Sequence, residues 1–145
     1  MTHLQQAIWQ IFEPMQQWQT RGIEYEFVFD TQNNHYQVLM HGWRGAKRLY
    51  HVMIHFAIKG EFIWIEENNT EIDFTEEFLE YGVGKDRIVL GFYPPEHRTL
   101  EGFASGGVKL EKPIRHDRTL RFALKKLNCT WDFENCVHTC TLFSR

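Results

Sequence analysis

The spacing of apolar residues changes from helical to extended within the first thirty positions of the chain. An i, i+3, i+4, i+7 stripe near the N-terminus predicts a helix that buries one face. Its members are Leu4, Ile8, Ile11, Phe12, Met15 and Trp18. Pro14 removes a backbone donor inside this stretch and clashes with the preceding turn. We therefore expect a kinked helix, or two short helices, ending near Arg21-Gly22.

Alternating apolar and polar positions then predict four strands, at about residues 23–30, 35–41, 48–59 and 61–66. The apolar face of the first two strands consists of Ile23, Tyr25, Phe27, Phe29, Tyr36, Val38 and Met40. The predicted apolar face of the third strand consists of Tyr50, Val52, Ile54, Phe56 and Ile58. Trp64 lies in the middle of the fourth strand. Short turns join these segments, which favours an antiparallel meander with one buried face.

Helical spacing returns after the meander, where apolar residues from Phe74 to Tyr81 predict a second helix. Asn69-Thr70 and Asp73 are candidate N-caps, and Gly82 is a candidate C-terminal cap. The apolar run at 88–92 predicts a further strand or a buried extended segment. The predicted fold class is α+β: a four-stranded antiparallel meander with an N-terminal helix and a second helix packed on one face, plus a short further strand.

Charge and cysteine content both change near Ser105. Residues 1–104 contain 8 basic and 15 acidic residues, a balance of −7, whereas residues 105–145 contain 8 basic and 4 acidic residues, a balance of +4. All three cysteines lie in the second segment, and a flexible Ala-Ser-Gly-Gly run stands at the change. We predict a domain of residues 1–104 and a C-terminal extension of residues 105–145.

The chain has no apolar run near the roughly 20 residues that a membrane span requires. Its first residues lack the basic and long apolar regions of a signal peptide. We therefore expect a cytoplasmic protein that makes no membrane contact.

Several motifs occur in order between Phe29 and Ala104: FDTQNNHYQ, GW followed by basic residues, VMIHFAIKGEFIWIEENNTE, GVGKDRIVLGFYPPEHR and GFA. Together they resemble the XisI-like family, the fdxN element excision controlling factors, over about residues 1–104. The resemblance implies a regulatory protein that helps a site-specific recombinase remove a DNA element during heterocyst differentiation. It also implies a nuclease-like companion, XisH. We expect no enzyme activity, no cofactor and no bound metal.

The chain departs from the family pattern at two places. Pro14 stands where the resemblance implies an uninterrupted first helix, and residues 105–145 lie beyond the pattern. The extension is either a further adaptation or read-through into DNA that never coded for a folded segment. Its weak periodicity favours the second explanation and a poorly ordered tail.

Polar residues of the meander form the first group of candidate site residues. With turns at Gln32-Asn33 and at Gly45, the expected cross-strand pairs are Asp30 with His35, Glu24 with His41, His35 with His55, and Leu39 with His51. Asp30, His35 and His55 would then cluster, and such groups suit Zn²⁺ binding or proton transfer. A small metal-binding protein or enzyme is therefore one alternative function. A solvated or partner-contacting face is the simpler interpretation, because a one-residue slip would reverse the faces.

The cysteines offer a second group. Cys129, Cys136, His138 and Cys140 fall within twelve positions, yet the cysteines are seven and four residues apart and lack the usual C-x2-4-C spacing of zinc sites. Free thiols in a reducing compartment are the favoured interpretation.

Charge and loop chemistry favour protein partners. A net acidic domain repels phosphate, and only Arg44, Lys47 and Arg48 concentrate positive charge, which permits at most a weak or indirect DNA contact. We expect an XisH-type nuclease-like partner and a recombinase. Inhibition of the nuclease-like partner by the acidic domain is a second alternative function. Homo-oligomerisation stays open. The predicted partner-binding residues are Tyr93, His97, Arg98, Asp30, His35 and His55.

Overall fold

The structure is a computed structural model that describes residues 1–99, 101–107, 129–132 and 137–140. The chain divides into two compact units, Met1–Val108 and Lys109–Arg145. In the second unit, β6 (Cys129–Asp132) and β7 (Val137–Cys140) pair as a two-stranded antiparallel sheet. The first unit contains every other helix and strand of the described residues. The predicted division into a domain of residues 1–104 and an extension of residues 105–145 stays a prediction.

Helix α1 spans His3–Met15 and begins with a reciprocal cap. Gln5 N donates to Thr2 Oγ1 at 3.2 Å, and Thr2 N donates to Gln5 Oε1 at 2.9 Å. The predictions of two short helices and of helix as far as Arg21 are wrong, because residues 16–22 form no helix. Pro14 falls in the last turn of α1, so its missing donor lies where the helix ends instead of in the middle of it.

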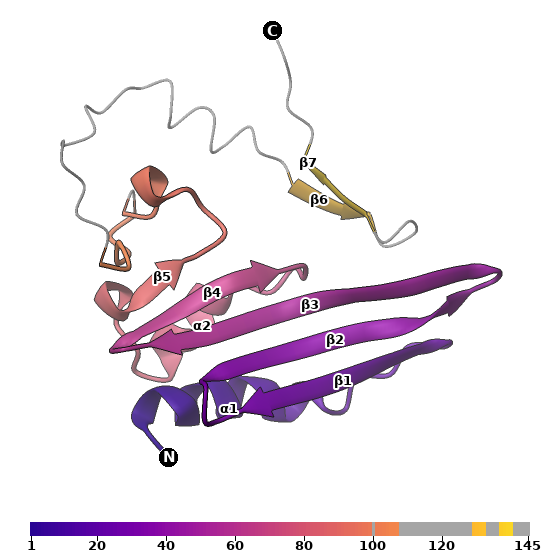
Figure 1. Cartoon of the computed structure of the whole chain (residues 1–145), viewed down its shortest axis with the longest axis horizontal. Helices are drawn as coiled ribbons and strands as arrows, with labels where there is room; N and C mark the ends of the chain where they lie inside the picture. Colours follow the sequence, from indigo (N-terminus) through magenta and orange to yellow (C-terminus); the bar gives the residue numbers. More distant parts are fainter. Residues whose placement is uncertain (100, 108–128, 133–136, 141–145) are drawn as a thin grey trace, which may run out of the picture. The chain divides into compact units, whose positions relative to one another are not determined.

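The sheet of the first unit has the strand order β1-β2-β3-β4-β5 (Figure 1). Its strands are β1 (Ile23–Asp30), β2 (His35–Arg44), β3 (Lys47–Lys59), β4 (Phe62–Asn68) and β5 (Ile88–Leu90). The first four strands pair antiparallel, which confirms the predicted meander. The short further strand is also confirmed. It pairs parallel with β4, so the sheet is mixed.

A β-bulge reverses the faces of β3 partway along the strand. Val38 lies opposite Ile54 but Leu39 lies opposite Val52, so one residue of β3, Met53, has no partner. Ile54 and Phe56 are therefore buried as predicted. Between the bulge and the turn to β2, the opposite set of β3 residues faces the core. Leu49 is buried there and Tyr50 is 64% exposed, so the prediction that Tyr50 and Val52 share the buried face with Ile54 is wrong.

Both helices cover one face of the sheet, and Phe56 lies where they meet. Its ring stacks on Phe12 of α1 at 5.1 Å and meets the rings of Phe74 and Phe78 at 5.0 Å each. Phe74 and Phe78 belong to α2 (Phe74–Glu80), whose N-cap is Asp73, one of the predicted candidates. The predicted α+β architecture with two helices on one face is confirmed.

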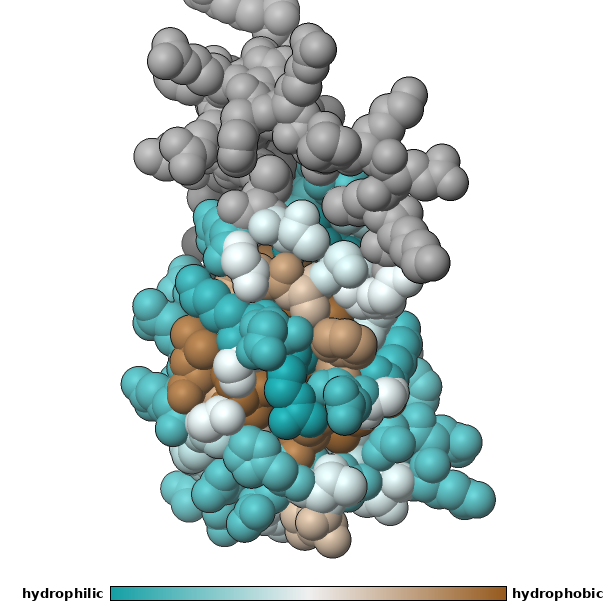
Figure 2. Space-filling model, turned by 90° about the vertical axis from the view of Figure 1, so that its left-hand side faces the viewer, coloured by the Kyte–Doolittle hydropathy of each residue, from teal (hydrophilic) through white to brown (hydrophobic). Residues whose placement is uncertain are grey.

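The opposite face of the sheet, called the outer face below, is partly covered near β4. Trp64 points to this face, and the cationic ends of Lys59 and Arg98 lie over its ring at 4.0 Å and 4.9 Å. The segment that provides Arg98 follows η1 (Lys85–Arg87) and β5, and includes η2 (Pro95–His97). Figure 2 shows brown apolar side chains between teal hydrophilic ones on the side of the first unit that faces the viewer. In the described part of the chain, no helix is both long and apolar enough to cross a membrane.

Candidate functional site

The first hairpin has the predicted register, but the Asp30 carboxylate forms hydrogen bonds within its own turn. Asp30 lies opposite His35. Its carboxylate accepts hydrogen bonds from Gln32 N at 3.1 Å, Asn33 N at 2.8 Å and Asn33 Nδ2 at 2.7 Å. These bonds, those from Asn33 above all, hold the pKa of Asp30 below its usual value. The Asp30 carboxylate thus stabilises the four-residue turn.

His35 and His55 meet on the outer face, although the predicted pairing between them is wrong. His35 lies opposite Ala57, and His55 lies opposite Gln37. The predicted pairing of Leu39 with His51 is wrong as well, because Leu39 lies opposite Val52. The two-residue turn at Gly45-Ala46 and the bulge at Met53 together displace the register from the prediction. The diagonal neighbours still reach each other, since His35 Nδ1 and His55 Nε2 are 3.1 Å apart. Burial, and then the adjacent His35, lowers the pKa of His55.

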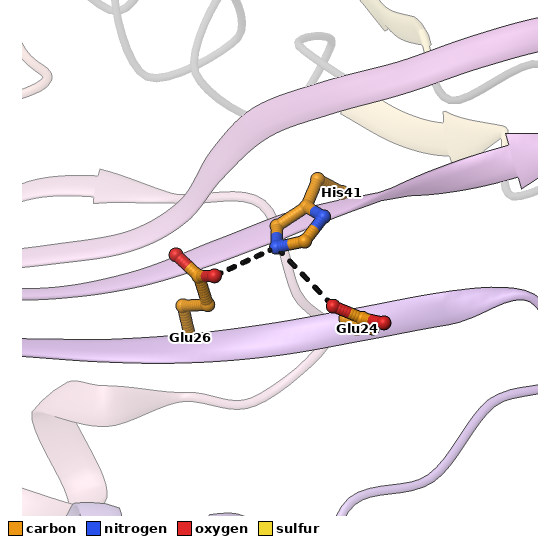
Figure 3. A group of neighbouring side chains, drawn as sticks. All are labelled: Glu24, Glu26 and His41. Atoms are coloured by element: carbon orange, nitrogen blue, oxygen red, sulfur yellow. Dashed lines mark ion pairs between the residues drawn. The ribbon is translucent and has the colours of Figure 1, made fainter.

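A second polar cluster joins β1 and β2 on the outer face (Figure 3). His41 Nε2 lies 3.0 Å from a Glu26 oxygen and 3.7 Å from a Glu24 oxygen. The predicted pairing of Glu24 with His41 is correct. Ligand atoms of these three residues lie within 4.8 Å of one another, a spacing that a metal ion could bridge. The His41 side chain is 15% exposed, whereas the Glu24 and Glu26 side chains are 78% and 58% exposed. An ion pair at the surface accounts for this geometry without a metal.

An aromatic and basic cluster lies at the β2–β3 turn on the same face. The Arg48 guanidinium carbon lies 5.6 Å from the Trp43 ring centre and 5.8 Å from the Tyr50 ring centre. Trp43 is 56% exposed and Tyr50 is 64% exposed. Sequence reasoning identified the basic residues here but missed the aromatic ones. The Gly-Trp step directly before Arg44 was the available signal.

The predicted loop residues Tyr93, His97 and Arg98 lie together after β5. Arg98 Nε donates to the Tyr93 carbonyl at 3.0 Å, and its guanidinium covers Trp64. Arg98 therefore ties this loop to the sheet. Phe92, which sequence reasoning did not name as a site residue, is 47% exposed beside Tyr93. A partner contact by these residues stays a prediction.

The candidate zinc ligands of the extension lie where no side chain is described. Backbone pairing places Cys129 opposite Cys140 and Trp131 opposite His138. The prediction of free thiols stays a prediction.

The first unit is a small α+β domain in which two helices cover one face of a meander and the other face presents ionic, imidazole and aromatic groups. The family model described as XisI protein matches residues 1–105. The chain belongs to the XisI protein family, which confirms the resemblance seen in the sequence.

Two solved structures are similar to this chain. A XisI-like protein from Anabaena variabilis ATCC 29413 is 29% identical, covers 71% of this chain and 98% of its own, and superposes with a TM-score of 0.64. The fdxN element excision controlling factor XisI from the same organism is 30% identical, covers 71% of this chain and 96% of its own, and superposes with a TM-score of 0.62. No curated protein sequence matches the chain.

Proposed function

We propose that this protein is a controlling factor for the excision of a DNA element and that it acts by binding proteins. The observation that carries the proposal is the match of residues 1–105 to the XisI family, together with the similarity to a solved excision controlling factor. The proposed partners are a nuclease-like protein of the XisH type and a site-specific recombinase. The proposed location is the cytoplasm.

The chemistry of the outer face supports a protein partner. Trp43, Tyr50 and Arg48 are of the residue types that dominate binding energy at protein interfaces, and both rings are more than half exposed. Carboxylates of Glu24 and Glu26 lie on the same face. A surface that combines aromatic groups with charges of both signs suits a folded protein better than a polyanion, because exposed carboxylates repel phosphate.

A regulatory role without catalysis is the form of the proposal that we favour. Asp30, the acid of the trio that a catalytic interpretation requires, is bound within its own turn. The alternative of a metal-binding protein would rest on Glu24, Glu26 and His41 instead of the predicted trio. Metal analysis of the purified chain separates the two: a stoichiometric transition metal would favour the alternative.

Co-purification of the full chain with the nuclease-like companion tests the proposal. We expect a complex that survives gel filtration and weakens as salt rises, because charge pairs at an interface rim are screened. Fluorescence anisotropy with duplex DNA at physiological salt should show no binding in the range of about 10⁻⁴ to 10⁻⁶ M that is typical of non-specific binders. Salt-sensitive, sequence-selective DNA binding with no protein complex would overturn the proposal. Inhibition is distinguished by whether the complex lowers the companion's nuclease activity.

A further inference from the structure

We propose that β1 is a docking edge, to which a protein partner adds one strand with basic side chains on one face and apolar side chains on the other. The inference rests on the proposed function only in taking the partner to be a protein. β1 is the outermost strand of the sheet and spans eight residues (Figure 1). At the opposite end, β5 spans three residues, and Ala104 N donates to the Ile88 carbonyl at 2.9 Å. Of the described sheet, β1 is therefore the long edge.

Backbone groups of alternate β1 residues point away from β2. Trp43 N donates to the Gly22 carbonyl at 3.1 Å, so the even-numbered residues direct their N–H and C=O groups towards β2. Alternation then directs those of Tyr25, Phe27 and Phe29 to the outside. In the described part of the chain, no backbone hydrogen bond reaches these three residues from that side. The backbone N–H and C=O groups of these three residues are thus available to form hydrogen bonds with a further strand.

β1 lacks most features that keep an edge from pairing with another strand. Its register with β2 runs through eight pairs without a bulge, and the strand contains neither proline nor lysine. An open groove lies beside the first half of β1 and is lined by residues 18–21 and 23–26. The carboxylates of β1 are the remaining feature that opposes pairing with another strand. They favour a partner strand with basic side chains.

On the helix side, the apolar surface continues to this edge. Tyr25, Phe27 and Phe29 are all partly exposed, unlike the buried apolar residues of β2. Trp9 of α1 is 44% exposed, and its ring centre lies 5.4 Å from that of Phe29. Apolar side chains of an added strand would cover this row, which is the source of affinity in the proposal.

On the outer face, Glu24 and Glu26 present side chains that are 78% and 58% exposed. Side chains directly opposite on an added antiparallel strand would stand about 4.5–5.5 Å away, so lysine or arginine there pairs with each carboxylate. A second copy of β1 fits less well. Symmetric pairing about Phe27 sets Glu24 against the second copy's Asp30, and pairing about Glu26 sets Glu26 against itself. Like charges directly opposite are destabilising.

Amide hydrogen exchange of the full chain provides the test, with a blocked synthetic peptide of alternating lysine and valine, about as long as β1, as the probe. At ten times its dissociation constant, the peptide should slow exchange about tenfold at the amides of Tyr25, Phe27 and Phe29. Amides of Glu24 and Glu26, already directed at β2, should change little. Protection elsewhere, or nowhere, would overturn the inference.

Exchanging the charges on β1 tests whether its carboxylates pair with basic side chains of the added strand. The double variant Glu24→Lys with Glu26→Lys should no longer bind the lysine peptide and should instead bind a peptide of alternating glutamate and valine. The control, Glu61→Lys with Glu71→Lys, makes the same net charge change at exposed positions outside β1 and should keep the original preference. Unchanged melting temperatures verify that both variants fold. Equal loss of binding in both variants would indicate general charge attraction and contradict a docking edge.

Co-purification separates this inference from the proposed function. If the wild type and the Glu24→Lys, Glu26→Lys variant both capture the nuclease-like companion equally, the docking edge is wrong and the proposed function stands. If peptide protection occurs at β1 but neither protein captures the companion, the proposed function fails and the docking edge stands.

Discussion

Phe56 is the side chain whose truncation should destabilise the domain most. It is fully buried at the meeting point of both helices and the sheet, with Phe12 stacked at 5.1 Å and Phe74 and Phe78 at 5.0 Å. Phe56→Ala removes an entire ring from a site that three other rings surround. Those rings belong to two helices fixed by their own packing, so they cannot move inwards together to fill the space.

The expected cost follows from this geometry. Truncation of a buried phenylalanine to alanine typically costs about 3–5 kcal/mol, which combines the lost transfer free energy and the cavity term. Loss of three aromatic pairs places Phe56 towards the upper end, since each such pair adds about 0.5–1.5 kcal/mol. At about 4 °C per kcal/mol for a domain of this size, the melting temperature should fall by about 12–20 °C.

Thermal and urea unfolding followed by circular dichroism measure this change. Phe56→Leu should recover more than half of the loss, because it refills most of the volume. Tyr50→Ala on the same strand is the matched control, because Tyr50 is 64% exposed on the outer face and should change stability little. A Phe56→Ala protein that melts within a few degrees of the wild type, or a Tyr50→Ala protein that melts far below it, would refute the assignment of the faces of β3.

Three further expectations concern single positions. Gly42→Ala should cost about 1–3 kcal/mol in urea unfolding, because a Cβ there would overlap backbone atoms of the adjacent strand segment; a neutral effect would contradict this close approach. Burial lowers the pKa values of His51 and His55, so the unfolded state takes up more protons below about pH 6.5 and stability should fall from pH 7 to pH 5; His51→Gln should reduce this fall, and a flat profile in the wild type would contradict the burial. Arg98→Ala should cost about 1–2 kcal/mol by loss of the contact with Trp64, and a double-mutant cycle with Trp64→Leu should show coupling; additive losses would contradict the contact.

The sequence predicts most of the fold because helix and strand periods are distinct. Residues Ile23–Asp30 alternate except at Val28 and end at turn-forming residues, and the bounds of β1 are predicted to the residue. The bulge at Met53 was not predictable in this way, because an extra residue leaves a period-two pattern that can be continued with either phase. Tyr50 was misassigned for this reason alone.

The candidate site was only partly predictable. The contact between His35 and His55 is present despite a wrong register, because side chains on neighbouring strands also reach diagonally. Asp30 was assigned to the histidine cluster, although an aspartate followed three residues later by asparagine in a turn commonly binds its own backbone. The ring contacts of Arg48 depend on the exact register across the Gly45-Ala46 turn, which the predicted turn at Gly45 missed by one residue.

The most direct test of the account compares protein and DNA binding by one immobilised sample of the full chain. The nuclease-like companion and a duplex containing an excision site are passed over it separately, at rising salt. We predict saturable binding of the companion, weaker in the Glu24→Lys, Glu26→Lys variant, and no binding of the duplex at physiological salt. Saturable duplex binding without companion binding would contradict the account.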